Sequence, residues 1–233
     1  MTRGQNYGHL LPPIAGPDDF VGAFGVSRET ATRLETYAAL LVQWQKTINL
    51  VASSTLPGLW HRHFADSAQL LALAPDARSW MDLGSGAGFP GLVIALLLAE
   101  RGGPATVTLV ESDTRKAAFL AEVIRKTGIG AAITVEIAKQ RIETAATQGS
   151  LAKVDVVSAR ALAPLEPLLR LAERFLGPES LGLFLKGREA EAEIGDARKC
   201  FDFDCRLTPS RTDASGLIVA VQGLRAKTEG KGR

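Results

Sequence analysis

The sequence contains few cysteines and no long apolar run. Only two of its 233 residues are cysteines, Cys200 and Cys205, which excludes a disulfide framework and favours a reducing compartment. The longest apolar run, Leu92–Ala99, is far shorter than the roughly 20 residues that a membrane-spanning helix needs. Residues 1–16 contain no apolar core of the kind that signal peptides have. We therefore expect a cytoplasmic protein without a membrane segment.

The net charge is also small. Lys and Arg number 27 and Asp and Glu number 25, which leaves a formal charge of +2. This excludes a polycationic protein that coats nucleic acid, but not an RNA-modifying enzyme with a local basic rim, because a total does not locate charges. The hydrophobic fraction of 46% and the charged fraction of 22% are near the globular average. They exclude a disordered tail protein, a collagen and a coiled-coil rod.

The chain changes in character along its length. Residues 1–26 are rich in glycine and proline and predict an irregular lead-in. Ser27 is a suitable cap for an amphipathic helix that follows it, and the spacing of apolar residues predicts a second helix over 59–72. The expected organisation is a lead-in and helical cap over 1–75, an α/β domain over 76–224 and a basic, mobile tail over 225–233.

From residue 79 onward, short strand-like runs alternate with helical patterns. Five such runs precede helices, and two final runs are joined without a helix. The predicted strands are 79–83, 106–111, 132–138, 154–159, 181–185, 201–207 and 217–222. Alternation of this kind predicts a doubly wound α/β fold, here a mostly parallel seven-stranded sheet that ends in an antiparallel hairpin. That architecture is typical of Rossmann-like class I methyltransferases.

A glycine-rich turn follows the first predicted strand. It reads Asp82-Leu83-Gly84-Ser85-Gly86-Ala87-Gly88-Phe89-Pro90-Gly91. Glycines here permit positive φ and close approach of a ligand to the backbone, and the next helix begins with unpaired N–H groups. The absence of Gly-Lys-Ser/Thr excludes a nucleoside triphosphate loop. The glycine spacing also satisfies the dinucleotide pattern, so NAD stays open. However, Gly84-x-Gly86-x-Gly88 after Asp82 more closely resembles an S-adenosylmethionine loop, with Asp82 near the methionine end.

Glu111 ends the second predicted strand, more than 20 residues past the glycines. A carboxylate at that place can accept hydrogen bonds from both hydroxyls of a ribose. We therefore predict that Glu111 binds the adenosine ribose of the cofactor. Neither motif distinguishes S-adenosylmethionine from NAD by itself, and the predicted terminal hairpin favours the methyl donor.

Seven further strings occur in order along the chain. They are Asn49-Leu50, residues 61–67, residues 88–91, Glu111-Ser112 with Arg115-Lys116, residues 141–143, residues 158–161 and residues 185–187. Over roughly residues 35–225 they resemble the small-subunit ribosomal RNA methyltransferase G family, also called glucose-inhibited division protein B. The resemblance implies a bacterial cytoplasmic enzyme. It would transfer the methyl group of S-adenosylmethionine to N7 of a guanine in the decoding-region loop of 16S ribosomal RNA.

The resemblance and the residue patterns together yield a set of site predictions. The family's cofactor contacts fall on Gly84, Phe89, Ile142, Glu143 and Arg160, and the loop and strand arguments add Asp82, Gly86 and Glu111. We predict that Arg160, at the end of the fourth strand, is catalytic and contacts the guanine, the RNA backbone or the cofactor carboxylate. The predicted RNA-binding residues are Arg62, Arg115, Lys116 and Lys186.

Several chemical signatures are missing, and their absence fits attack by guanine N7. That atom carries a free lone pair and no proton, so alignment of the two reactants suffices. The Asn/Asp-Pro-Pro-aromatic loop of exocyclic amine methylation is absent, and neither cysteine lies near the fourth strand's tip. His61 and His63 have no third ligand nearby, so we expect no metal. We expect a monomer acting on 16S ribosomal RNA or the small subunit. Alternatives are methylation of another RNA, a small molecule or a protein, an NAD-dependent oxidoreductase and a silent RNA-binding module.

Overall fold

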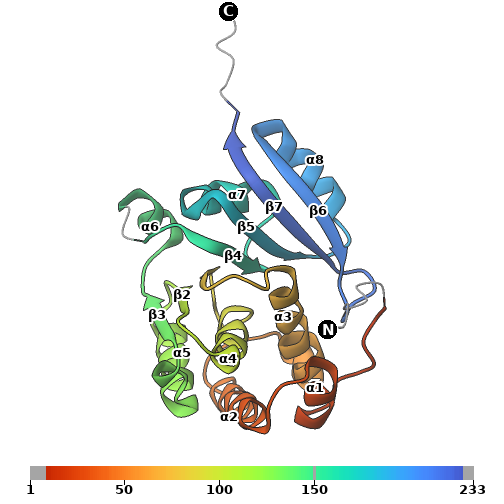
Figure 1. Ribbon diagram of the computed structural model, residues 1–233, viewed down its shortest axis with the longest axis vertical. Coiled ribbons are helices and arrows are strands. Elements are labelled where there is room, and N and C mark those ends of the chain that lie inside the picture. Colours follow the sequence, from red (N-terminus) through yellow and green to blue (C-terminus); the bar gives the residue numbers. More distant parts are fainter. Residues whose placement is uncertain (1–8, 149–150, 228–233) are drawn as a thin grey trace, which may run out of the picture.

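The computed structural model describes residues 9–148 and 151–227, which form a seven-stranded sheet with helices on both faces (Figure 1). The strands are β1 (Ser79–Leu83), β2 (Thr106–Val110), β3 (Thr134–Ala138), β4 (Val154–Arg160), β5 (Leu176–Lys186), β6 (Phe201–Pro209) and β7 (Leu217–Ala226). The α-helices are α1 (Pro17–Phe24), α2 (Arg28–Trp44), α3 (Asp66–Ala68), α4 (Gly91–Arg101), α5 (Thr114–Thr127), α6 (Ile142–Gln148), α7 (Leu165–Ala172) and α8 (Ala190–Cys200). Short 3-10 turns are η1 (Ser53–Gly58), η3 (Gln69–Leu73), η4 (Ile129–Ala131) and η5 (Glu173–Phe175), and η2 (Trp60–Ala65) is a π-helix.

The strand order is β3-β2-β1-β4-β5-β7-β6. β1 to β5 run parallel to one another, whereas β7 is antiparallel to both β5 and β6. The predicted mostly parallel sheet with a terminal antiparallel hairpin is therefore confirmed. The chain reverses its direction of travel across the sheet between β1 and β4. In sheets of this kind, ligands bind outside the carboxyl ends of the strands at that point.

The sheet separates two apolar cores. Trp80 and Leu109 face the core that contains α2, α4 and α5, whereas their chain neighbours Met81 and Val110 face the core under α7 and α8. Successive strand residues point to opposite faces, so a strand buried on both faces is apolar throughout. Figure 1 shows the N-terminal helices α1 to α3 on the same side of the sheet as α4 and α5. The cap therefore covers one face of the sheet.

The lead-in is more regular than its glycines and prolines predict. Helix α1 forms within it, with Pro17 in its first turn and Asp18 and Asp19 beside it. Gly25 ends the helix with φ of 68°, in the left-handed region. Proline at the start of a helix and glycine just past its end are common at helix boundaries. The prediction of an irregular segment over 1–26 is therefore wrong for residues 17–24. Ser27 caps α2 as predicted, since its side chain accepts a hydrogen bond from the Thr30 amide.

The helix predicted over 59–72 is not one regular α-helix. It comprises the π-helix η2, one turn of α3 and the 3-10 turn η3. Two other contacts compete here with the regular ladder. The Arg62 carbonyl accepts a tertiary hydrogen bond from Arg160 at 3.1 Å, and Ser67 Oγ donates locally to the His63 carbonyl at 2.7 Å. Single π turns inside helices are frequent at functional sites.

The end of the chain also differs from its prediction. β7 continues to Ala226, which pairs with Phe201 of β6, so Arg225 lies in the sheet rather than in a tail. Residues 228–233, the rest of the predicted basic tail, and residues 1–8 lie outside the described residues. Among the helices formed by 9–148 and 151–227, none has the length and apolar character needed to cross a membrane.

Candidate active site

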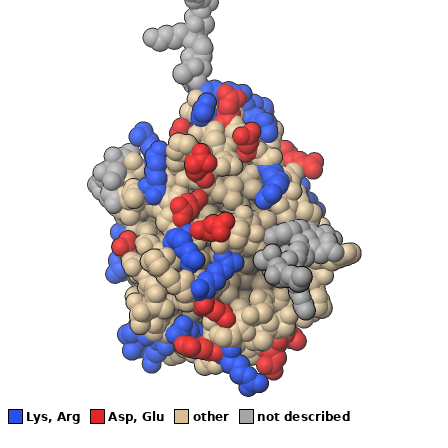
Figure 2. Space-filling view, in the orientation of Figure 1, with Lys and Arg blue, Asp and Glu red and all other residues tan. Residues whose placement is uncertain are grey.

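A cavity of about 760 Å³ lies at the carboxyl ends of β1, β4 and β5. Its walls come from several parts of the chain. They are residues between 50 and 66, the loop between β1 and α4, residues 160–164 at the end of β4, the end of β5, Glu193 of α8 and the loop between β6 and β7. Figure 2 shows cationic and anionic side chains interspersed over one face of the molecule, without a field of one sign. Because the cavity lies at the carboxyl ends of β1 and β4, where the chain reverses its direction across the sheet, it is the strongest candidate for a ligand site among the described residues.

The glycine loop, residues 84–91, forms one wall. Gly84 and Gly86 have φ of +67° and +56°, and both line the cavity. A Cβ at Gly86 would meet nothing closer than 3.7 Å, so the backbone is open to a ligand there. A Cβ at Gly91, by contrast, would lie 2.4 Å from Leu109 Cδ2. Gly86 thus leaves room for a ligand, and Gly91 leaves room for the sheet.

Asp82 lies beneath this loop and does not line the cavity. It is fully buried, its Oδ1 accepts a hydrogen bond from Ser158 Oγ at 3.0 Å and its Oδ2 accepts one from the Gly91 amide at 3.2 Å. Burial raises the pKa of Asp82 to about 6, against the lowering effect of the groups that donate to it. The predicted role of Asp82 near the methionine end of the cofactor stays a prediction, since here Asp82 contacts only groups of the protein. Asp82 fixes the start of α4 against β1 and β4.

Glu111 holds the loop from the side of β2. Its Oε2 accepts a hydrogen bond from the Gly86 amide at 2.8 Å, and its Oε1 accepts one from the Asp113 amide at 2.7 Å. The predicted proximity of this carboxylate to the glycines is thus present in the structure. Ile142 is buried in the core under α7, and Glu143 is exposed in the first turn of α6. Neither of these two lines the cavity, nor does Glu111.

Arg160 at the tip of β4 forms the opposite wall. Its Nη2 lies 2.6 Å from His63 Nδ1, and its Nη1 donates to the Arg62 carbonyl at 3.1 Å and lies 3.7 Å from Asp66 Oδ2. Its guanidinium carbon lies 5.0 Å from the centroid of Phe89, within the range of a cation–π contact. Burial lowers the pKa of Arg160, and Asp66 opposes that effect. These contacts therefore fix the position of the positively charged Arg160 side chain beside the glycine loop.

The groups around Arg160 are themselves fixed. His63 Nε2 lies 2.8 Å from Thr55 Oγ1, and Asp66 Oδ1 accepts hydrogen bonds from Thr212 Oγ1 at 2.7 Å and Gln69 Nε2 at 2.9 Å. Thr212 belongs to the loop between β6 and β7, so this loop reaches into the site. Burial, assisted by nearby Arg160, lowers the pKa of His63 to about 3, so its ring is neutral.

Phe89 joins the two walls. Its ring stacks on His63 with centroids 5.0 Å apart and on Tyr37 with centroids 5.3 Å apart. Tyr37 donates a hydrogen bond to the Ala87 carbonyl within the glycine loop, and burial raises its pKa well above the usual value. The apolar residue that the resemblance implies at position 89 therefore packs between the cap and the loop and also lines the cavity.

The predicted RNA-binding residues do not form one patch. Arg62 is 56% exposed at the cavity, where it lies 3.9 Å from Asp213 Oδ2. Lys186 is only 9% exposed, and its Nζ contacts Glu193 Oε2 at 2.7 Å and donates to the Ala163 carbonyl at 2.6 Å. Lys186 is thus occupied within the protein.

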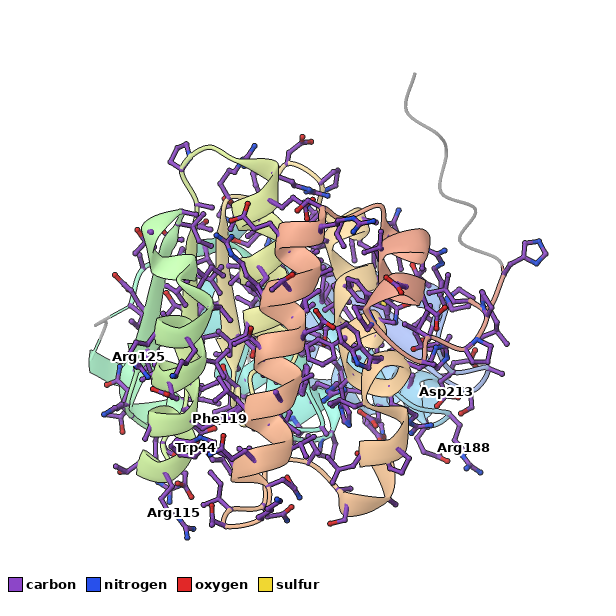
Figure 3. The ribbon with its side chains drawn as sticks, turned by 90° about the horizontal axis from the view of Figure 1, so that it is seen from below. Trp44, Arg115, Phe119, Arg125, Arg188 and Asp213 are labelled. Atoms are coloured by element: carbon purple, nitrogen blue, oxygen red, sulfur yellow. The ribbon has the colours of Figure 1, made fainter. Side chains whose placement is uncertain are left out.

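The other two predicted residues lie on α5, away from Asp213, the partner of Arg62. Arg115 is exposed in the first turn, and Lys116 follows it half-buried. Figure 3 shows Arg115 at one side of the molecule and Asp213 with Arg188 at the opposite side. α5 itself packs on α2 through the rings of Phe119 and Trp44, with centroids 5.7 Å apart (Figure 3).

The sequence predictions do not include several residues of the site, among them Thr55, Asp66, Ser210 and Thr212. Asp66 lies within the string of residues 61–67, so that string was a usable signal for it. Ser210 and Thr212 sit in what reads as an ordinary hairpin loop, and no local pattern marks them. In the part of the chain that the structure describes, no group of three or more His, Cys, Asp or Glu side chains is placed to hold a metal ion.

Several solved structures share this fold. A putative O-methyltransferase from Klebsiella pneumoniae matches with a TM-score of 0.57 at 15% identity, over 89% of this chain and 96% of its own. An O-methyltransferase from Bacillus cereus in complex with SAH matches with a TM-score of 0.56 at 16% identity, over 88% and 96%. At such identities the likeness concerns the fold alone, and it confirms the predicted class I methyltransferase fold.

The sequence relatives are much closer. The model of a family described as rRNA small subunit methyltransferase G matches residues 30–225. A protein of Parvibaculum lavamentivorans named Ribosomal RNA small subunit methyltransferase G is 51% identical over 214 residues, 91% of this chain and 92% of that protein. A protein of the same name from Rhodospirillum centenum is 53% identical over 216 residues, 92% and 94%. The chain therefore belongs to the rRNA small subunit methyltransferase G family.

Proposed function

We propose that this protein transfers the methyl group of S-adenosylmethionine to N7 of a guanine in the decoding-region loop of 16S ribosomal RNA. The observation that carries the proposal is the cavity that brings Gly84 and Gly86 opposite Arg160. A cavity of about 760 Å³ is within the range of sites for small ligands, and its open end can receive a base. Family membership supplies the RNA as the acceptor.

The residues present fit S-adenosylmethionine. At Gly86 the space beside the backbone is open, and a side chain there would fill it. At Gly84 a Cβ would lie 2.7 Å from Leu162 Cδ1, so only glycine fits there. We assign the methionine end to these glycines and the ribose to the side of Glu111, which accepts from the Gly86 amide. The family's contacts at Ile142 and Glu143 stay predictions from the resemblance, since neither residue lines the cavity. When bound, the cofactor supplies a methyl group on a positively charged sulfur. The protein's part is to align that group with the acceptor.

The titratable side chains of the cavity favour an acceptor that needs no general base. Its lining contains one histidine and three carboxylates: His63, Asp66, Glu193 and Asp213. His63 faces Arg160, Asp66 accepts from Thr212 and Gln69, Glu193 pairs with Lys186, and Asp213 accepts from Ser215. Each of these four side chains already has a hydrogen-bond or ion-pair partner within the protein. A nucleophile with a free lone pair and no proton, such as guanine N7, suits this arrangement.

Arg160 is the residue that we assign to the reactants. Three of its neighbours hold it from the protein side, and it still lines the cavity. Its position suits contact with the cofactor carboxylate, with the guanine or with an RNA phosphate. Arg62, which is exposed at the same cavity, is suited to bind RNA phosphate. We further propose that the protein works as a monomer in the bacterial cytoplasm, without a metal, on 16S ribosomal RNA or the small subunit.

Methyl transfer from tritiated S-adenosylmethionine to small subunits that lack the modification tests the proposal. We expect label in 16S ribosomal RNA, and a loss of tenfold or more for Arg160→Ala, which corresponds to about 1.4 kcal/mol of barrier. Arg170→Ala is a control, because Arg170 is an exposed arginine on α7 that pairs with Glu166. Label found only in a protein or metabolite fraction would contradict the RNA substrate. Unchanged activity of Arg160→Ala would remove Arg160 from the site.

A further inference from the structure

We propose that His63 and Asp66 are positioning residues that hold the Arg160 guanidinium against Phe89, so that its remaining N–H groups face the cavity. We call these two residues the clamp. The clamp comes from the N-terminal cap, whereas Arg160 comes from the sheet. This inference rests on the proposed function in one respect, namely that Arg160 contacts a reactant. The clamp itself follows from contacts within the protein.

The direction of the hydrogen bonds is fixed by the chemistry of arginine. A guanidinium can only donate, so His63 Nδ1, 2.6 Å from Arg160 Nη2, must accept. Its other ring nitrogen, Nε2, then carries the proton and donates to Thr55 Oγ1 at 2.8 Å. Thr55 Oγ1 donates in turn to the Ala52 carbonyl at 2.6 Å. The result is a directed chain from Arg160 through His63 to the backbone of the segment before η1.

Asp66 provides the second contact and the compensating charge. Its Oδ2 lies 3.7 Å from Arg160 Nη1, and both side chains are 18% exposed. Its Oδ1 accepts hydrogen bonds from Thr212 and Gln69, so the carboxylate cannot rotate without losing them. An ion pair this far from solvent is screened less than a surface pair. The loop between β6 and β7 therefore helps to orient Arg160 through Asp66.

The neutral state of His63 is essential to this arrangement. Burial is the main cause that lowers the pKa of His63 to about 3, and the positive charges of Arg160 and Arg62 add to it. A protonated ring would turn its Nδ1–H toward a guanidinium, with two donors facing each other. The ring also stacks on Phe89, which lies under the Arg160 guanidinium carbon. His63 thus contacts both the charge and the aromatic ring that frame it.

The first test is a long-range ¹H–¹⁵N correlation spectrum of the wild-type protein without ligands. The chain has three histidines, so assignment is direct. We expect one of them, His63, to be in the Nε2–H form throughout pH 5–8. In Arg160→Met we expect its pKa to move upward, because one of the causes that lower it is removed. A wild-type His63 that carries its proton on Nδ1, or that titrates between pH 5 and 8, would overturn the clamp.

The second test is a matched pair of substitutions. His63→Asn places a carbonyl oxygen near the position of Nδ1, whereas His63→Gln places one near Nε2. We expect kcat/KM for methyl transfer to stay within about threefold of the wild type for His63→Asn and to fall at least tenfold for His63→Gln, with the same Tm for the two variants. Equal losses in the two variants would contradict a positioning role. If the wild type does not methylate RNA at all, the proposed function fails, while the spectrum still decides the clamp.

Discussion

The glycine loop and the Arg160 side of the cavity differ in how far along the chain their parts lie. Within the loop, Asp82 binds the Gly91 amide across nine residues. Across the cavity, Arg160 contacts His63 over 97 residues, and Asp66 accepts from Thr212 over 146 residues. The glycine loop takes its shape mainly from local backbone geometry, although Ser158 and Tyr37 hold it from other parts of the chain, whereas the Arg160 side is assembled by tertiary contacts. The first can therefore be recognised in a sequence as a motif, and the second cannot.

The two walls also use their carboxylates differently. Asp82 is fully buried and holds the backbone at the start of α4. Asp66 is 18% exposed and faces a cation that lines the cavity. Burial raises the pKa of both carboxyl groups. We therefore expect substitutions under the loop to change stability and substitutions around Arg160 to change function more than stability.

The largest effect that we predict is at Gly91. A Cβ there would lie 2.4 Å from Leu109 Cδ2 and 2.8 Å from Asp82 Oδ2, so Gly91→Ala should reduce the free energy of unfolding by about 3 kcal/mol. Gly86→Ala is the matched control. Its Cβ has open space, and only the left-handed φ of +56° opposes it, at a cost of about 1 kcal/mol.

Urea unfolding measures both variants, and calorimetry with S-adenosylhomocysteine separates their causes. We expect Gly86→Ala to remain folded and to bind S-adenosylhomocysteine at least tenfold more weakly. If Gly86→Ala bound normally, or if Gly91→Ala were as stable as the wild type, the division of the loop into a ligand side and a sheet side would be wrong.

The second effect concerns Asp82 and pH. An unfolded Asp ionises near 3.8, whereas native Asp82 stays protonated up to about 6. Between these values the native state binds more protons, so the stability that Asp82 contributes falls as pH rises and then levels off. Relative to Asp82→Asn, the wild type should lose about 1.5 kcal/mol between pH 4.5 and 6. Unfolding at four pH values from 4.5 to 7.5 measures this, and parallel curves for the two proteins would count against it.

The smallest effect concerns two basic residues of the cavity. Arg62 is exposed, whereas Lys186 is paired with Glu193 inside the protein. We expect Arg62→Ala to reduce the slope of log affinity for 16S RNA against log salt by about one, since one phosphate contact is lost. Lys186→Met should leave that slope unchanged. Filter binding at several salt concentrations tests the pair, and a lower slope for Lys186→Met would restore it as a phosphate ligand.

The sequence is sufficient for the sheet and for the glycine loop. Strand alternation and the hairpin set the fold, and glycine spacing locates the loop, because both are local patterns. Helix α1 is not predicted from the sequence, although Pro17 and Gly25 are residues that commonly begin and end a helix. The breaks between 59 and 73 were missed because they depend on Arg160, which approaches from another part of the chain. Thr212 was missed because only the folded hairpin brings its loop to Asp66.

The measurement that tests the central claim most directly is mass-spectrometric mapping of the methylated nucleotide in 16S ribosomal RNA from cells with and without this protein. We predict a single 7-methylguanosine in the decoding-region loop that is absent without the protein and restored by the wild type, but not by Arg160→Ala. Identical methylation in both RNAs, or a lost methyl group on another atom, would contradict the account.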